Sequence, residues 1–135
     1  MTAIVAANGR EQALRYLIGD TSTTEELRLR LFRNDVTPDE DSVTGDFTEA
    51  TFTGYASVLL DTWTVTPGTV PEAVHTLIDF VSSADQTAET IYGYYVVRVT
   101  SNDLVAAKRF TGAPYSVQYI GDAISVTPTV SVTGA

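Results

Sequence analysis

The sequence predicts an all-β protein: an antiparallel β-sandwich, jelly-roll-like, with one short N-terminal α-helix. Two observations predict this class. Threonine, valine, alanine and serine dominate the composition, and the branched Cβ of threonine and valine suits a pleated strand better than a helix. Short segments of alternating apolar and polar residues also recur along the chain, separated by turn residues. Seven or eight such segments indicate a sandwich or jelly roll rather than βαβ units.

The N-terminal region is expected to contain an arm and the one helix. The spacing predicts a helix over residues 11–18, with Gly19 at the position that commonly ends one. Residues 1–7 are expected to form an arm, and residues 8–135 a single domain, because the chain has ordinary single-domain length and contains no linker or internal repeat. The apolar residues at helical spacing are Ala13, Leu14, Leu17 and Ile18.

The first strand is predicted where three leucines alternate with Arg28 and Arg30, over residues 27–31. A polar stretch follows over residues 33–46 and contains five acidic residues. We expect a long surface loop there, because such a segment could not bury its backbone cheaply.

The rest of the chain is predicted to form strands separated by turns. A polar turn at residues 101–103 lies between two strongly β-prone segments, which predicts a hairpin. The remaining polar and glycine-containing stretches mark the other strand ends. The predicted strands cover residues 55–60, 62–66, 74–81, 91–99, 104–110, 115–120 and 123–132.

Charge and composition exclude several classes of partner. The formal net charge of −9 opposes binding to nucleic acid or to anionic lipid. The absence of cysteine removes disulfides, thiolate nucleophiles and cysteine-based zinc sites. We find neither a secretory signal nor a stretch long enough to span a bilayer, so no membrane partner is expected.

Few residues suggest catalysis. His75 is the single histidine, and we interpret it as an isolated side chain on the outer face of a strand. Asp61, Asp79 and Glu89 could in principle pair as glycosidase carboxylates, but their order in the sequence does not establish the short separation that this reaction needs. No catalytic residue is assigned, and the chain is expected not to be an enzyme.

Three further groups of residues admit both a binding and a structural interpretation. The acidic loop could hold a hard cation, but its spacing fails the EF-hand pattern and a solvated loop is preferred. An arginine stripe is interpreted as the outer face of a strand, and a set of aromatic residues as core or cross-strand pairs rather than a sugar platform. No cofactor or metal is expected. The groups are Asp35, Asp39, Glu40, Asp41 and Asp46; Arg28, Arg30 and Arg33; and Trp63, Tyr92, Tyr94 and Tyr95.

Six phrases follow one another along the chain: "LRLRLFRNDVTP" at 27–38, "FTGYASVLL" at 52–60, "WTVTPG" at 63–68, "IYGYYVV" at 91–97, "AKRF" at 107–110 and "GDAISVTP" at 121–128. In this order they resemble a family of small virion structural proteins from tailed bacteriophages. The resemblance spans residues 27–130 and departs from the family pattern at residues 107–110.

This resemblance implies a role in the phage particle. We expect a capsid decoration, or cement, protein that binds the major capsid protein on the outside of the head, as a trimer, in virions assembled in the bacterial cytoplasm. The expected partner-binding residues are those of the arm, Thr2, Ala3, Ile4 and Val5. A tail-tip or fibre component that binds a host glycan remains open, as does, more remotely, a small glycan hydrolase.

Overall fold

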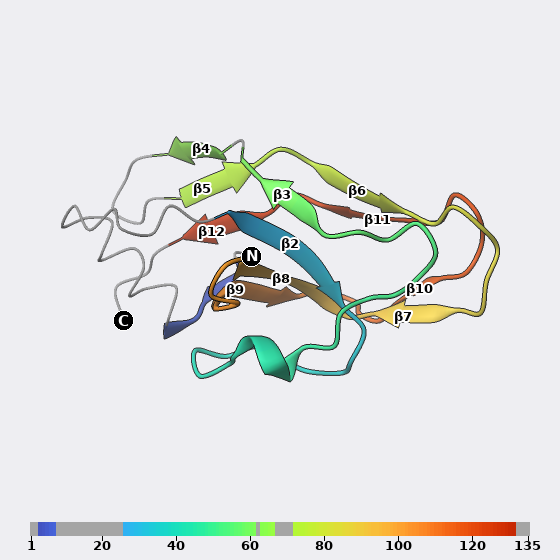
Figure 1. Cartoon of the computed structure of the whole chain (residues 1–135), viewed down its shortest axis with the longest axis horizontal. Helices are drawn as coiled ribbons and strands as arrows, with labels where there is room; N and C mark the ends of the chain where they lie inside the picture. The colour runs from blue at the N-terminus through green and yellow to red at the C-terminus, as the bar shows by residue number, and fades with distance from the viewer. Residues whose placement is uncertain (1–2, 8–25, 62, 67–71, 132–135) are drawn as a thin grey trace.

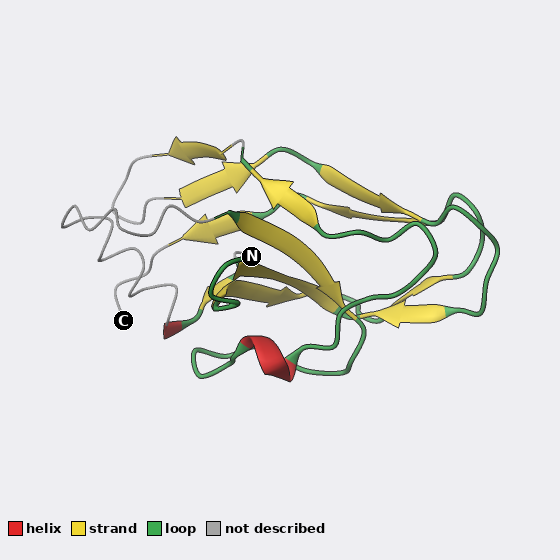
Figure 2. Cartoon of the chain, viewed as in Figure 1, coloured by secondary structure: helices red, strands yellow, loops and turns green. Residues whose placement is uncertain are grey.

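The computed structural model describes residues 3–7, 26–61, 63–66 and 72–131. This part of the chain is built from strands in antiparallel sheets (Figure 2), so the predicted all-β class is confirmed. The helix predicted over residues 11–18 lies outside the described residues.

Twelve strand segments and one 3-10 turn make up the described part of the chain (Figure 1). They form a five-stranded sheet, β1-β9-β8-β2-β3, a three-stranded sheet, β12-β5-β4, and the pairs β11-β6 and β10-β7. The elements are β1 (Ile4–Val5), β2 (Leu27–Phe32), η1 (Thr44–Asp46), β3 (Val58–Leu60), β4 (Trp63–Thr66), β5 (Glu72–His75), β6 (Ile78–Val81), β7 (Glu89–Ile91), β8 (Gly93–Arg98), β9 (Leu104–Arg109), β10 (Tyr115–Val117), β11 (Ala123–Val126) and β12 (Thr129–Ser131).

Strand β2 lies between β8 and β3 in the five-stranded sheet, and its alternation separates a buried side from a partly exposed one. Leu29 and Leu31 have no exposed surface, whereas Arg28 and Arg30 on the opposite side are partly exposed. Strand β2 pairs with β8 over its whole length and with β3 at its beginning. All six residues of β8 are buried, so both faces of this sheet are covered around β8.

One apolar cluster joins the five-stranded sheet to the strands on its other side. In Figure 1, β4, β5, β6 and β11 run along one side of the molecule and β8 and β9 along the other. The cluster draws side chains from β2, β8 and β9 and from β6 and β11. Its larger buried members are Leu29, Leu31, Phe52, Leu60, Ile78, Phe80, Ile91, Tyr94, Val96, Val117, Ile124 and Val126.

A second apolar cluster lies on the opposite face of the five-stranded sheet, beneath the long segment that follows β2. Phe47, just after η1, is 7% exposed and stacks on Tyr95 with 5.0 Å between ring centroids. Phe47 also contacts Phe32, at 4.9 Å. The polar stretch 33–46 and its continuation therefore cover the sheet, with apolar residues facing inward. The prediction of a simple surface loop missed this cover.

Three segments predicted as single strands are each divided in two. Residues 74–81 divide into the end of β5 and β6, because β5 pairs with β4 and β12 whereas β6 pairs with β11. Residues 123–132 divide into β11 and β12 around Pro128, which has no N–H for a ladder. Residues 91–99 divide at Tyr92, between β7 and β8.

The predicted hairpin is confirmed. Strands β8 and β9 pair antiparallel across the turn at residues 101–103, with a register shift between Val96 and Val97. Asn102 adopts a left-handed conformation, with φ of 59°, which asparagine tolerates better than most residues.

Candidate functional site

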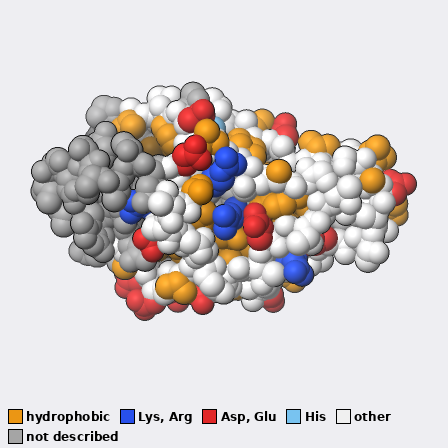
Figure 3. All heavy atoms as spheres, viewed as in Figure 1, with side chains coloured by type: hydrophobic (Ala, Val, Ile, Leu, Met, Phe, Trp, Pro, Cys, Tyr) orange, Lys and Arg blue, Asp and Glu red, His pale blue; other side chains and the backbone are white. Residues whose placement is uncertain are grey.

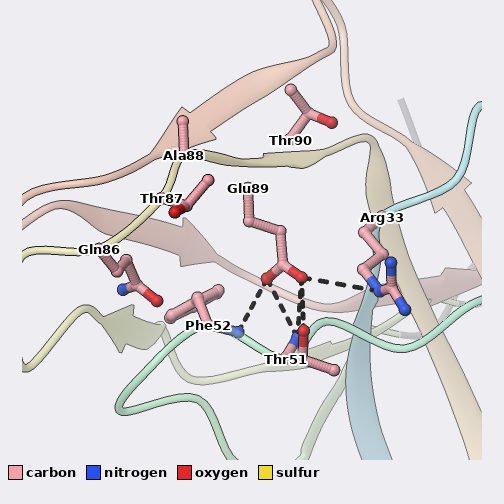
Figure 4. A pocket seen from close by; sticks show the side chains of 8 residues that line it. All are labelled: Arg33, Thr51, Phe52, Gln86, Thr87, Ala88, Glu89 and Thr90. Atoms are coloured by element: carbon pink, nitrogen blue, oxygen red, sulfur yellow. Dashed lines mark hydrogen bonds and ion pairs between the residues drawn. The ribbon is translucent and has the colours of Figure 1, made fainter.

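A polar pocket of about 330 Å³ lies between β7 and the segment that leads to β3 (Figure 4). Its centre is the Glu89 carboxylate, whose side chain is 15% exposed. Figure 4 shows this carboxylate pointing at the backbone of Thr51 and Phe52, with Arg33 to one side. The lining residues are Arg33, Thr51, Phe52, Gln86, Thr87, Ala88, Glu89 and Thr90.

Both oxygens of Glu89 are already engaged. The Thr51 hydroxyl donates to Oε1 at 2.8 Å, and the Phe52 N–H donates to Oε2 at 2.8 Å. The Thr51 N–H lies 3.0 Å from Oε2, and the Arg33 guanidinium lies 3.6 Å from Oε1. Nearby, the Gln86 side-chain oxygen accepts a hydrogen bond from the Thr53 N–H at 2.7 Å. Glu89 and Gln86 therefore fasten the chain at residues 51–53 to β7 and the segment before it.

A tight turn with two exposed apolar side chains lies between β10 and β11. Tyr119 is 58% exposed and Ile120 is 67% exposed. Asp122 Oδ2 accepts hydrogen bonds from the N–H groups of Gln118, at 2.9 Å, and Tyr119, at 2.8 Å. Gly121 has φ of +90°, a conformation that glycine adopts readily. We call residues 118–122 the apolar turn.

The apolar turn is also fixed to the segment that follows β6. The Ile120 N–H donates to Asp85 Oδ1 at 2.9 Å, and the Gly121 N–H donates to the Ser82 carbonyl at 2.9 Å. The Ser82 N–H in turn donates to the Asp122 carbonyl at 2.8 Å. These bonds hold the backbone of the turn while both apolar side chains face solvent.

Hydrogen bonding keeps Asp122 ionised. The N–H groups of Tyr119 and Gln118 hold the pKa of Asp122 below its usual value, because they stabilise the carboxylate form. The apolar turn therefore carries negative charge next to its apolar side chains.

A groove of about 340 Å³ lies between β10 and β11. Phe110 and Tyr115 supply aromatic surface, with 6.0 Å between ring centroids, and Tyr115 is 44% exposed. Lys108, the single lysine of the chain, contributes a cation. The lining residues are Lys108, Phe110, Thr111, Tyr115, Ala123, Ile124 and Ser125.

The predicted arm is in part a strand of the main sheet. Ile4 and Val5 form β1 and pair with β9, and Ala3 is 4% exposed. Ile4 is 43% exposed, while Thr2 lies outside the described residues. The Ala3 N–H also donates to the Thr129 carbonyl at 3.3 Å, next to β12. Partner binding by Thr2, Ala3, Ile4 and Val5 stays a prediction.

His75 lies in the interior, not on the outer face that the sequence interpretation gave it. It is 5% exposed and contacts Trp63 edge-on, with 5.4 Å between ring centroids. Nδ1 lies 2.9 Å from the Thr76 carbonyl oxygen, which can only accept, so Nδ1 donates. Nε2 has no hydrogen-bond partner among the described residues, and Asp61 Oδ1 lies 3.9 Å away. The alternation pattern failed because β5 ends at this residue.

The three carboxylates considered for glycosidase chemistry have separate surroundings. Asp61 lies near His75, Glu89 lies in the polar pocket, and Asp79 accepts a hydrogen bond from the Ser125 hydroxyl at 2.5 Å. The structure therefore offers no sign that they act as a pair.

The acidic loop is also tied to the protein. The Asp35 carboxylate pairs with Arg109 at 2.6 Å, and the Thr44 hydroxyl donates to the Asn102 carbonyl at 2.7 Å. Within the loop, Asp39 Oδ1 accepts from the Asp41 N–H at 2.9 Å. Over the ranges that the structure describes, no three histidine, aspartate or glutamate side chains are grouped as a metal site would require.

The arginine stripe forms ion pairs along the sheet. Arg28 lies 3.8 Å from Glu26, and Arg30 lies 3.7 Å from Glu49. These contacts, together with the approach of Arg33 to Glu89, agree with the structural interpretation of the stripe.

The aromatic residues considered as a sugar platform are mostly internal. Tyr94 and Tyr95 are each 2% exposed and belong to the two apolar clusters. Arg109 covers the Tyr92 ring at 5.1 Å from its centroid. The preferred interpretation as core residues therefore holds for Tyr94 and Tyr95, whereas Trp63 and Tyr92 are half-buried and pack against the clusters.

The sequence places a break at residues 121–122 but predicts a strand through residues 115–120, whereas β10 ends at Val117 and leaves Tyr119 and Ile120 in the turn. The signal for the turn is the Gly121-Asp122 pair immediately after Tyr119 and Ile120. A glycine and an acceptor side chain at this spacing are typical of a tight turn, which leaves the preceding apolar residues at its tip.

None of three comparisons, with protein-family models, with curated proteins and with solved structures, finds a match for this chain. Within the described ranges, no helix has the length and apolar character that crossing a bilayer requires.

Proposed function

We propose that this chain is a structural, non-enzymatic protein of a tailed-phage particle, with a jelly-roll-like β-sandwich fold. Within that class the proposed role is capsid decoration: the protein binds the outer surface of the head lattice, as a homotrimer. The phage assignment rests on the ordered phrases over residues 27–130. Two of these phrases coincide with the half-buried strand β2 and the fully buried strand β8.

The contacts of the Glu89 carboxylate are the observation that supports the structural role. Glu89 is the acid among the residues that line the polar pocket, and its oxygens accept hydrogen bonds from Thr51 and Phe52 while pairing with Arg33. A carboxylate held in this way joins parts of the scaffold and has little freedom to move a proton for a substrate. These hydrogen bonds and this ion pair hold the scaffold rigid, which favours a protein that binds its partner through its outer surface.

A decoration protein needs that rigidity because it binds through many weak contacts repeated over a lattice. Multivalency then raises the overall affinity without any single strong contact. The net charge of −9 opposes nucleic acid as the ligand and leaves protein surfaces as the favoured partner.

Cosedimentation tests this function. Purified protein is mixed with phage heads that lack it, and bound and free protein are measured after pelleting. Saturable binding at a fixed number of copies per head is expected. Binding to tails with no binding to heads would instead support the tail-tip role.

One observation favours the tail-tip alternative. The groove beside Tyr115 combines aromatic rings with Lys108 and Ser125, a combination that suits a sugar. Glycan arrays probe this alternative, and a decoration protein gives no saccharide signal on them.

A further inference from the structure

We propose that the apolar turn is the docking element of this protein, and that its occupant is a protein surface with an apolar socket flanked by cationic side chains. This inference rests on the proposed function, because the surface we assign is that of the head lattice. It adds which residues bind and what chemistry the lattice must present.

Exposure singles out the apolar turn. Tyr119 and Ile120 are 58% and 67% exposed, and they are adjacent in the sequence. The other large apolar side chains with comparable exposure in the described ranges, such as Val65 and Leu77, each stand without such a neighbour in the sequence. Two adjacent exposed apolar side chains can enter one pocket together.

Rigidity makes this exposure useful for binding. Five hydrogen bonds join the turn's backbone to the Asp122 and Asp85 side chains and to the Ser82 backbone, at distances between 2.8 and 2.9 Å. The Gln86 N–H adds another bond, to the Gln118 carbonyl at 2.8 Å. A loop that is already ordered loses little conformational entropy on binding, so more of the contact energy contributes to affinity.

The position of the turn leaves it accessible. In Figure 1 the segments that follow β6 and β10 form one end of the described part of the molecule. Figure 3 shows hydrophobic side chains beside acidic ones at this end. A projecting end can enter a depression in a lattice without clashes from the rest of the protein.

The carboxylates beside the apolar turn indicate which side chains surround the partner's apolar socket. Asp85 and Asp122 flank the two apolar side chains, and the hydrogen bonds to Asp122 favour its ionised form. Carboxylates brought to an interface lose water, so the partner must supply opposite charge or donors. Tyrosine is also enriched among the residues that dominate binding energy at interfaces. A socket rimmed by lysine or arginine therefore fits this turn.

The test compares two double variants in binding to heads that lack the protein. Tyr119→Ser with Ile120→Ser removes the apolar turn's side chains, and Val65→Ser with Leu77→Ser is the matched control, since those residues are 65% and 61% exposed. We expect the first variant to bind at least tenfold more weakly, as roughly expected for hot-spot residues. The control should bind within about twofold of the unchanged protein, as is usual for surface changes.

The binding results of the two variants distinguish failure of the docking role from failure of the decoration role. If the unchanged protein binds heads and the Tyr119/Ile120 variant binds equally well, or if both variants weaken equally, the docking role is overturned while the decoration role stands. If the unchanged protein does not bind heads, both fail. Melting temperatures of the variants within about 3 °C of the unchanged protein show that the fold is intact.

A second pair of substitutions tests the cationic rim. Asp85→Asn and Asp122→Asn remove charge but keep an oxygen that can accept the same backbone hydrogen bonds. Binding of the unchanged protein should weaken as salt rises, and the variant should show a flatter salt dependence. An identical salt dependence for the two proteins overturns the cationic rim.

Discussion

The Arg33 guanidinium lies 3.6 Å from the Glu89 carboxylate and so joins the end of β2 to the start of β7. Glu89 also accepts the backbone N–H groups of Thr51 and Phe52. One side chain thereby fixes the long segment between β2 and β3 against the sheets.

Glu89→Ala should lower the free energy of unfolding by about 1–3 kcal/mol, because two backbone N–H groups lose their acceptor. Urea denaturation provides the measurement. Glu26→Ala is the control: its side chain is 59% exposed and lies 3.8 Å from Arg28, a surface pair that contributes little. Equal effects of the two substitutions would show that Glu89 does not hold the segment.

Phe47→Ala should destabilise the protein by about 3–5 kcal/mol, the usual range for truncating a buried phenylalanine. The ring is 7% exposed and packs on Phe32 and Tyr95. Limited proteolysis should also cut residues 33–57 faster in this variant. Val43→Ala, in the same segment and 52% exposed, serves as the control. If both variants resist protease equally, the segment is not anchored by Phe47.

Gly93→Ala should cost about 3 kcal/mol, because its Cβ would lie 2.1 Å from the Lys108 carbonyl oxygen and 2.6 Å from the Phe32 ring. Denaturant titration measures the loss. At Gly45 an added Cβ meets nothing within 4 Å, so Gly45→Ala should change stability by less than about 1 kcal/mol. A Gly93→Ala protein as stable as the Gly45→Ala protein would contradict the packing around β8.

The free energy of unfolding should fall at high pH, because the structure favours the neutral form of three tyrosines. Burial raises the pKa of Tyr55, Tyr94 and Tyr95, and the hydrogen bond from Tyr55 to Glu49 raises that of Tyr55 further. The folded-state pKa values therefore exceed the unfolded value of 10.0. The contribution of these groups to stability is fully present below pH 10 and is lost as pH rises through the folded values.

Urea denaturation at several pH values above 10 tests this dependence. Tyr55→Phe should show a smaller alkaline loss, because one of the three groups is gone. The same variant should be less stable at neutral pH by about 1 kcal/mol, since the Leu31 N–H loses its acceptor. An alkaline loss identical in the two proteins would contradict the account of Tyr55.

Asp122→Ala should expose the amides of Gln118 and Tyr119 to hydrogen exchange, whereas Asp122→Asn should preserve their protection because it retains an acceptor oxygen. Exchange followed by NMR measures both. The pKa of Asp122 is lowered by these bonds, so the stabilisation is present above the unfolded value of 3.8 and is lost as pH falls through the folded value. Protection that survives in Asp122→Ala would show that other contacts hold the turn.

Patterns among neighbouring residues predicted the strands and turns that neighbouring residues determine. The alternating leucines predicted β2, and the polar turn at residues 101–103 predicted the β8-β9 hairpin. The sheet order could not be predicted, because it depends on pairing between distant segments such as β1 with β9.

Burial on both faces explains the main failures. Alternation of apolar and polar residues marks a strand that has one solvent-exposed face. Both faces of β8 are buried, because the segment that carries Phe47 covers the second face. His75 was assigned to an exposed face because the alternation was extended past residue 75, where β5 ends. Tyr119 and Ile120 were assigned to a strand because apolar residues at a turn tip resemble the end of a strand.

Imaging of heads after addition of the purified protein tests the central claim most directly. The account predicts added density at regular lattice points on every head, with the end that carries Tyr119 and Ile120 against the capsid surface. Heads that remain bare at saturating protein concentration would contradict the decoration role.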